Sequence, residues 1–127
     1  MSRLTLYLLA CFAILAASDA GWAQGSDIAG RYRIEGSNPT GSGVYRGEVA
    51  IARAGDTYQV RWILEQGSQA GLGVVLDKVL AVTFQDGAAP AGIAAFRINP
   101  DGSLTGIWAG PGTVSVGTER WIPADRS

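Results

Sequence analysis

The sequence contains no histidine, one cysteine (Cys11) and one lysine (Lys78) among its 127 residues. These absences exclude a Ser-His-Asp triad and ordinary zinc or copper sites, and they leave no cysteine nucleophile in the body of the chain. Haem and iron–sulfur clusters also lose their usual ligands. Lysine can replace histidine as a base, but Lys78 follows Asp77 in an expected turn, where its charge is solvated. The sequence therefore predicts no cofactor and no metal site.

Concentrated charge of one sign is also absent. The chain has 10 basic and 11 acidic residues, scattered along its length. No basic face is available for nucleic acid, and no polybasic patch is available for a membrane surface. After residue 23 no stretch is apolar enough to enter a membrane.

The first 23 residues have the layout of a secretory signal peptide. Arg3 forms a short positive region, an apolar run extends from Leu4 to Ala17, and Gly21 and Ala23 occupy positions −3 and −1 before Gln24. The run is shorter than the roughly 20 residues of a spanning helix, which argues against a permanent anchor. Residues 1–23 are therefore expected to be removed during export.

Two alternatives concern the same segment. Cleavage after Ala20, with Ser18 at −3, also fits the pattern. Leu8-Leu9-Ala10-Cys11 loosely resembles a lipoprotein box, although the apolar run continues past the cysteine. The expected mature chain, residues 24–127, is one domain that contains neither cysteine nor histidine. Its core must be held by packing or association rather than by disulfides.

An alternation of apolar and polar residues dominates the mature chain, whereas a helical period is hard to find. The clearest case is Tyr58, Val60, Trp62 and Leu64, which alternate with polar or outward positions. Eight strands are expected, at 28–35, 44–52, 58–65, 70–76, 79–84, 92–98, 103–109 and 114–122.

Short turns join these segments, and glycine stands beside an aromatic residue in several of them. Asn99-Pro100-Asp101-Gly102 is typical of a β-turn, and its similarity to a calcium loop does not extend beyond the turn. Eight short strands predict an all-β fold: an antiparallel up-and-down meander that forms a closed or nearly closed small barrel.

Carboxylates are the remaining catalytic groups, since glycosidases can work with two acidic side chains. Alternation places Glu48 and Glu65 on the outward face. Glu119 shares a face with Gly117 and Trp121, so it is the acidic residue most suited to the interior. A buried carboxylate needs a partner, through an ion pair or hydrogen bonds. The arginines considered for this ion pair are Arg33, Arg61, Arg97 and Arg120.

The aromatic residues fill the core of a small barrel in the simplest interpretation. Some of them are also suited to a pocket, because an eight-stranded barrel can hold one small ligand at its mouth. The candidate ligand-binding residues are Tyr45, Trp62, Trp108, Glu119 and Trp121.

A series of short motifs runs through nearly the whole mature chain. It includes Gly30-x-Tyr32, Tyr45-x-Gly47, Asp101-Gly102-x-Leu104-x-Gly106-x-Trp108 and Gly117-Thr118-Glu119. In this order the motifs resemble a group of small exported bacterial proteins without an assigned activity. The resemblance implies a periplasmic or secreted location. A weaker similarity, through residues 102–108, is to avidin and calycin barrels, and no biotin-contacting positions are matched.

Three functions remain open at this point. The first is an exported, non-enzymatic barrel that binds a small, partly apolar ligand. The second is an envelope protein–protein interaction module, adhesin-like or inhibitor-like, that uses the glycine-rich loop 36–43 or a strand edge. The third is a carboxylate-only hydrolase built around Glu119.

Overall fold

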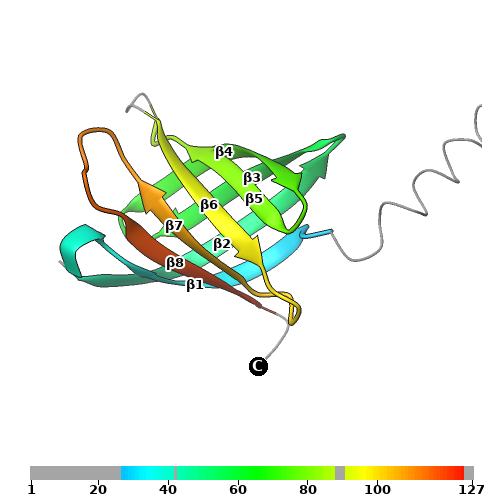
Figure 1. Ribbon diagram of the computed structural model, residues 1–127, viewed down its shortest axis with the longest axis horizontal. Helices are drawn as coiled ribbons and strands as arrows, with labels where there is room; N and C mark the ends of the chain where they lie inside the picture. The colour runs from blue at the N-terminus through cyan, green and yellow to red at the C-terminus, as the bar shows by residue number, and fades with distance from the viewer. Residues whose placement is uncertain (1–26, 42, 88–90, 125–127) are drawn as a thin grey trace, which may run out of the picture.

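The computed structural model describes residues 27–41, 43–87 and 91–124, and these form a closed antiparallel barrel in which every strand pairs with its neighbours in chain order (Figure 1). A 3-10 turn, η1 (Pro39–Gly41), lies between the first two strands. The strands are β1 (Gly30–Ser37), β2 (Val44–Ala54), β3 (Thr57–Leu64), β4 (Gly67–Leu76), β5 (Val79–Phe84), β6 (Gly92–Ile98), β7 (Leu104–Ala109) and β8 (Gly117–Pro123).

The observed strands confirm the predicted all-β meander of eight strands and its closure. Closure is made by β1 and β8, which pair from Tyr32 opposite Pro123 to Ser37 opposite Thr118. The largest differences, of three residues each, are at the starts of β4 and β8, which begin at Gly67 rather than residue 70 and at Gly117 rather than residue 114; the first strand begins at Gly30 rather than residue 28. Pro123, expected in the C-terminal tail, belongs to β8. The predicted signal peptide lies outside the described residues, and its cleavage stays a prediction.

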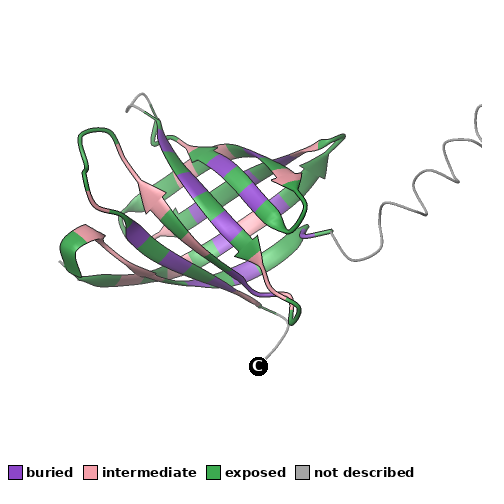
Figure 2. Ribbon diagram, viewed as in Figure 1, coloured by how far each residue is buried: buried purple, intermediate pink, exposed green. Residues whose placement is uncertain are grey.

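The strands alternate between buried and exposed residues, as Figure 2 shows by its purple and green bands. On β3, Tyr58, Val60 and Trp62 are buried, whereas Gln59 and Arg61 are exposed. Successive side chains of a strand point to opposite faces, so each strand contributes one row to the interior. The fully buried interior side chains include Trp121, Phe96, Ile34, Leu80, Leu104 and Val49.

Inward-facing glycines lie against aromatic rings of the neighbouring strand. Gly106 is paired with Phe96, and a Cβ atom added to Gly106 would lie 2.4 Å from a carbon of that ring. Gly117 has the same relation to Trp108. The missing side chain makes room for a large ring inside a narrow barrel. The same relation holds for Gly36 with Tyr45 and for Gly92 with Phe84, whereas Gly71, paired with Val60, is close to the ring of Trp62.

The two ends of the barrel are built differently. Short turns close one end, and the buried Ile28 lies there, its carbonyl accepting a 2.7 Å hydrogen bond from the Tyr32 hydroxyl. The Asn99–Ser103 turn is also at this end; Asp101 Oδ1 accepts hydrogen bonds from the Ser103 backbone N–H and hydroxyl, as expected for a β-turn. The longer connections after β1, β5 and β7 surround the opposite end, which we call the open end (Figure 1).

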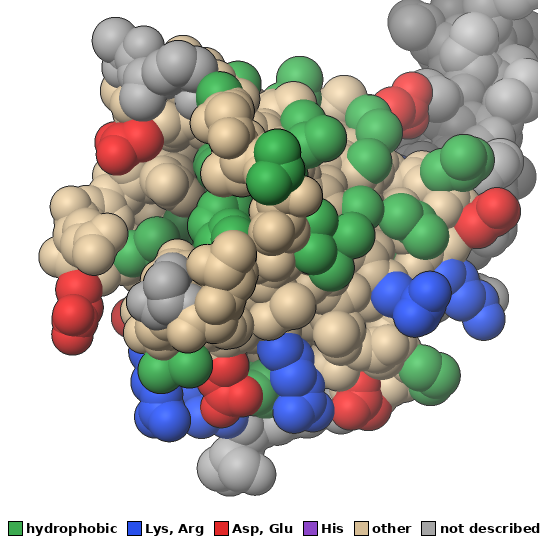
Figure 3. Space-filling view, turned by 60° about the vertical axis from the view of Figure 1, so that its left-hand side comes forward, with side chains coloured by type: hydrophobic (Ala, Val, Ile, Leu, Met, Phe, Trp, Pro, Cys, Tyr) green, Lys and Arg blue, Asp and Glu red, His purple; other side chains and the backbone are tan. Residues whose placement is uncertain are grey.

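The outer surface is divided into a charged half and an apolar half. Charged side chains project from β1, β2 and β8, where Arg31 and Glu48 form an exposed ion pair at 3.0 Å. The outward positions of β4 to β7 carry one charge, Arg97. Figure 3 shows hydrophobic side chains grouped across the middle of one face, with acidic and basic side chains along its margins. The large exposed hydrophobic residues of β4 to β7 are Leu72, Val74, Leu76, Val79, Ile93 and Ile107.

Candidate functional site

Glu119 is a buried acidic side chain inside the barrel, with 7% of its surface exposed. Its Oε1 accepts hydrogen bonds from the indole N–H groups of Trp121 (2.7 Å) and Trp62 (3.1 Å). Its Oε2 accepts a 2.5 Å hydrogen bond from the hydroxyl of Tyr45. Three donors on three strands therefore converge on one carboxylate, which is the arrangement expected for an ionised acceptor.

Tyr45 acts in this network as a donor because its phenol stays protonated. Burial raises the pKa of Tyr45 strongly above its ordinary value, and the negative charge of Glu119 and the hydrogen bond to it act in the same direction. Trp108 opposes part of this rise. The protonated phenol can therefore donate its hydrogen to the Oε2 atom of Glu119.

A cavity of about 560 Å³ lies at the open end and reaches down to Glu119. Five of its fourteen lining residues are aromatic, and six, among them Asn38 and Gln69, are polar or charged. This volume is in the range of pockets that hold small organic ligands. The aromatic wall residues are Tyr45, Trp62, Phe84, Phe96 and Trp108.

The Trp108 indole N–H is buried and makes no hydrogen bond of ordinary geometry with any described residue, although it interacts with the Tyr45 hydroxyl closely enough to lower the pKa of that group. Its ring packs edge-on against Tyr45 and Phe84, with centroid separations of 6.5 and 6.1 Å. A buried donor without an acceptor is unfavourable by about 1–3 kcal/mol. The ring of Trp108 lines the cavity, whereas its N–H lies against Gly117 of β8.

Four of the five predicted site residues line the cavity: Tyr45, Trp62, Trp108 and Glu119. Trp121 does not line it. Its ring lies below, fully buried, against Phe96 at 4.0 Å and Trp62 at 5.8 Å. Trp121 therefore supports the site from beneath and holds Glu119 in place through its indole N–H.

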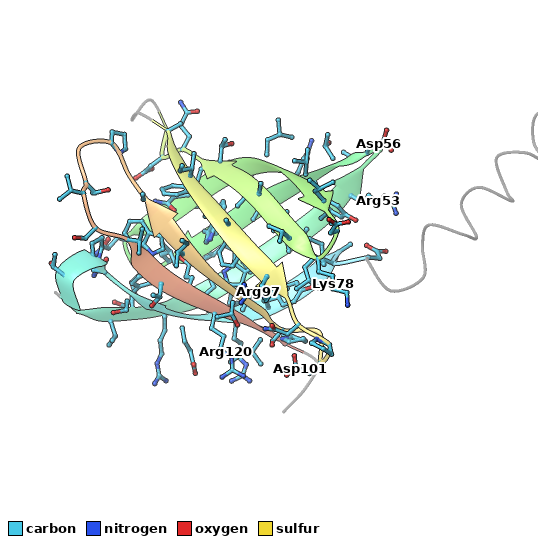
Figure 4. The ribbon with its side chains drawn as sticks, in the orientation of Figure 1. Arg53, Asp56, Lys78, Arg97, Asp101 and Arg120 are labelled. Atoms are coloured by element: carbon cyan, nitrogen blue, oxygen red, sulfur yellow. The ribbon has the colours of Figure 1, made fainter. Side chains whose placement is uncertain are left out.

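The proposed arginine partners of Glu119 were wrong. Arg33, Arg61, Arg97 and Arg120 are all exposed on outward positions of their strands, and hydrogen bonds from Tyr45 and two tryptophans replace the ion pair. Figure 4 shows Arg97 and Arg120 on the outside of the barrel, near the turn that contains Asp101. The period of two explains the error, because a residue adjacent to an inward position necessarily faces outward.

Sequence reasoning missed Phe84, Phe96, Ala94 and Gln69 as wall residues. The first three alternate with exposed neighbours, which was the available signal for an inward position. What the pattern did not contain was their height along the barrel axis. That height depends on the stagger between strands, so it became visible only with the register.

Within residues 27–41, 43–87 and 91–124, no group of three or more acidic, histidine or cysteine side chains could hold a metal ion. The same ranges contain no helix with the length and apolar character needed to cross a membrane. No protein-family model matches the sequence, and a search of curated proteins also finds no match.

Proposed function

We propose that the protein is an exported, non-enzymatic barrel that binds a small, partly apolar ligand in the cavity at its open end. The observation that carries this proposal is the aromatic-walled cavity of about 560 Å³, with the Glu119 carboxylate at its base. Apolar walls with a few converging polar groups are typical of ligand sites in small barrels.

The other two functions have less support. A hydrolase of the glycosidase type needs a second carboxylate that faces the scissile bond. Among the described residues the other acidic side chain lining the cavity is Glu65, which is exposed in the turn after β3. An interaction module that pairs through a strand edge is disfavoured because the closed barrel has no free edge, and a module that uses the glycine-rich loop 36–43 stays the alternative.

A neutral fluorescent probe such as N-phenyl-1-naphthylamine tests the proposal on residues 24–127. We expect saturable binding of one probe molecule, with a blue shift of its emission. Ala94→Phe would fill the cavity, because Ala94 is an inward wall residue opposite Trp108. We expect this variant to weaken binding at least tenfold.

Ala52→Phe is the matched control, since Ala52 is exposed at an outward position of β2 and does not line the cavity. We expect it to bind the probe as the wild-type protein does. Circular dichroism shows whether both variants are folded. Equal binding by the two variants, or no saturable binding by the wild-type protein, contradicts the proposal.

A further inference from the structure

The ionic state of the site restricts the kind of molecule that it can hold. Glu119 is buried, and its hydrogen-bond donors are all neutral groups. The ion pair formed within the described residues is between Arg31 and Glu48 on the outer surface. The negative charge inside the barrel thus has hydrogen bonds but no countercharge. An uncompensated buried charge is unfavourable, and a cationic ligand would remove this deficit.

The rim of the cavity does not supply that countercharge. Arg46 is the basic residue among the cavity-lining residues, and it is exposed at an outward position of β2. Glu65, also at the rim, carries the opposite charge. With Glu119 included, the lining has an excess of one negative charge. This favours cations and disfavours anions in the cavity.

The walls suit an organic cation better than a metal ion. Aromatic rings attract cations through their electron-rich faces, most strongly where water is excluded. A metal ion instead requires several oxygen or nitrogen ligands, and the described residues provide no such cluster. A carboxylate has about four acceptor positions, of which three are occupied here, so one remains for a ligand N–H group or a close ion pair.

We infer that the ligand is an organic cation: an amine or quaternary ammonium group beside Glu119, attached to an apolar body that the aromatic walls enclose. The inference rests on the proposed function, since it specifies the ligand class of the same cavity.

Benzyltrimethylammonium and neopentylbenzene form a suitable pair of test ligands, because they have nearly the same shape and differ by one positive charge. Phenylacetate supplies the anionic member. Each competes against N-phenyl-1-naphthylamine for the wild-type protein. We expect the cation to bind at least tenfold more tightly than the neutral compound, and the anion to bind most weakly.

Glu119→Gln adds a second measurement, because it removes the charge and nearly preserves the shape. We expect the advantage of the cation to fall at least tenfold, with the affinity of the neutral compound changed less than threefold. Equal binding of cation and neutral compound by the wild-type protein overturns the inference but leaves the proposed function intact. If the reporter probe itself does not bind, the proposed function fails. The comparison on wild-type protein decides the inference even if Glu119→Gln does not fold.

An independent observation concerns the outer face of β4 to β7, which we call the apolar face. It comprises Leu72, Val74, Leu76, Val79, Ala81, Ile93, Ala95 and Ile107. Its six large side chains are between 42% and 75% exposed. Together they present on the order of 600 Å² of apolar surface, at the upper limit of patches on monomeric proteins.

Small side chains at the centre of this face are bordered by larger ones, a shape that two copies of the same face can share. Ala81 on β5 and Ala95 on β6 are paired, and they form a shallow trough of small side chains. Val74 pairs with Ala81 on one side, and Ile107 pairs with Ala95 on the other, so larger side chains border the trough. In an isologous interface, a two-fold rotation would place the β4 ridge of each copy over the trough of the other.

We infer that a second copy of this chain covers the apolar face and forms a symmetric dimer. The exposed apolar area approaches the roughly 800 Å² per partner of a standard interface once the intervening small residues are included. A surface that packs against this nearly uncharged face is favoured when it also carries little charge, and the same face of a second copy does so.

Sedimentation equilibrium of residues 24–127 at micromolar concentrations tests this inference. We expect a dimer that Ile93→Lys dissociates, with an increase of at least tenfold in the dimer dissociation constant. Gln59→Lys, an exposed position on β3 outside the apolar face, is the control and should remain dimeric. A wild-type protein that is still monomeric at about 0.1 mM overturns the inference, because this concentration is far above the dissociation constant of a specific interface of this size. So does a dimer that is unaffected by Ile93→Lys, because another surface or partner would then be involved.

Discussion

The hydrogen bonds to Glu119 make a quantitative prediction about the stability of the barrel. Leucine at position 119 has a similar volume but no acceptor, so Glu119→Leu leaves the donors of Tyr45, Trp62 and Trp121 without a partner. Each buried donor left unpaired costs about 1–3 kcal/mol. Water from the adjoining cavity can reach part of this group, so we expect a loss of about 3–5 kcal/mol in the free energy of unfolding.

A double-mutant cycle distinguishes this explanation from a general loss of packing. Tyr45 is half-buried, so Tyr45→Phe in the wild-type background should cost about 1–2 kcal/mol through its charged hydrogen bond. In the Glu119→Leu background the hydroxyl has no acceptor, and its removal should cost at most about 0.5 kcal/mol. The expected coupling between the two positions is therefore about 1–2 kcal/mol.

Urea unfolding monitored by circular dichroism measures all four proteins of the cycle. Glu48→Leu is the control, because its ion pair with Arg31 is exposed and should contribute less than about 1 kcal/mol. A loss below about 1 kcal/mol for Glu119→Leu would refute the proposed role of the hydrogen bonds. Additivity within 0.3 kcal/mol, roughly the limit for independent sites, would refute the coupling to Tyr45.

Two further predictions concern packing and pH. Gly106→Ala should destabilise the barrel by about 2 kcal/mol or more, because the new Cβ would lie 2.4 Å from Phe96. Gly110→Ala is the control: its Cβ would enter open space, and it should change stability by less than about 0.5 kcal/mol. Equal urea midpoints for the two variants would contradict this prediction. The raised pKa values of Tyr32 and Tyr45 mean that the folded state holds these protons more tightly than the unfolded state. The contribution of these two tyrosines to stability should therefore be fully present below the ordinary tyrosine pKa of 10.0 and be lost as pH rises above it, with a smaller loss in Tyr45→Phe. Urea midpoints at pH 8 and pH 11 measure the difference, and an unchanged midpoint in the wild-type protein would count against it.

The strands and the inward position of Glu119 could be predicted from the sequence because both follow from local alternation. Tyr58, Val60 and Trp62 identify an inward row without any knowledge of the partners. The partners of Glu119 could not be predicted in this way. Tyr45 is 74 residues distant along the chain, and its hydroxyl reaches the carboxylate only because the barrel closes with a particular stagger.

The role of the strand glycines was also only partly predictable. Gly71 and Gly73 lie in a regular ladder with β3. What requires glycine at position 71 is the close approach of the Thr83 carbonyl oxygen and of the Trp62 ring, which would lie 2.0 and 2.8 Å from an added Cβ. A glycine within a strand pattern indicates that a neighbouring group comes close, but the sequence does not show which group of another strand it is.

The pairing of β1 with β8 has a consequence for how the protein folds. The contact between Tyr32 and Pro123 joins residues roughly 90 positions apart, which carries an entropic cost of about 4 kcal/mol for closing the loop. Hairpins between successive strands can form early, whereas this last ladder must wait for nearly the entire domain. Because Glu119 is on β8, the polar centre of the interior is completed only at that final step. A chain interrupted before Gly117 would have both an open sheet and aromatic donors without their acceptor.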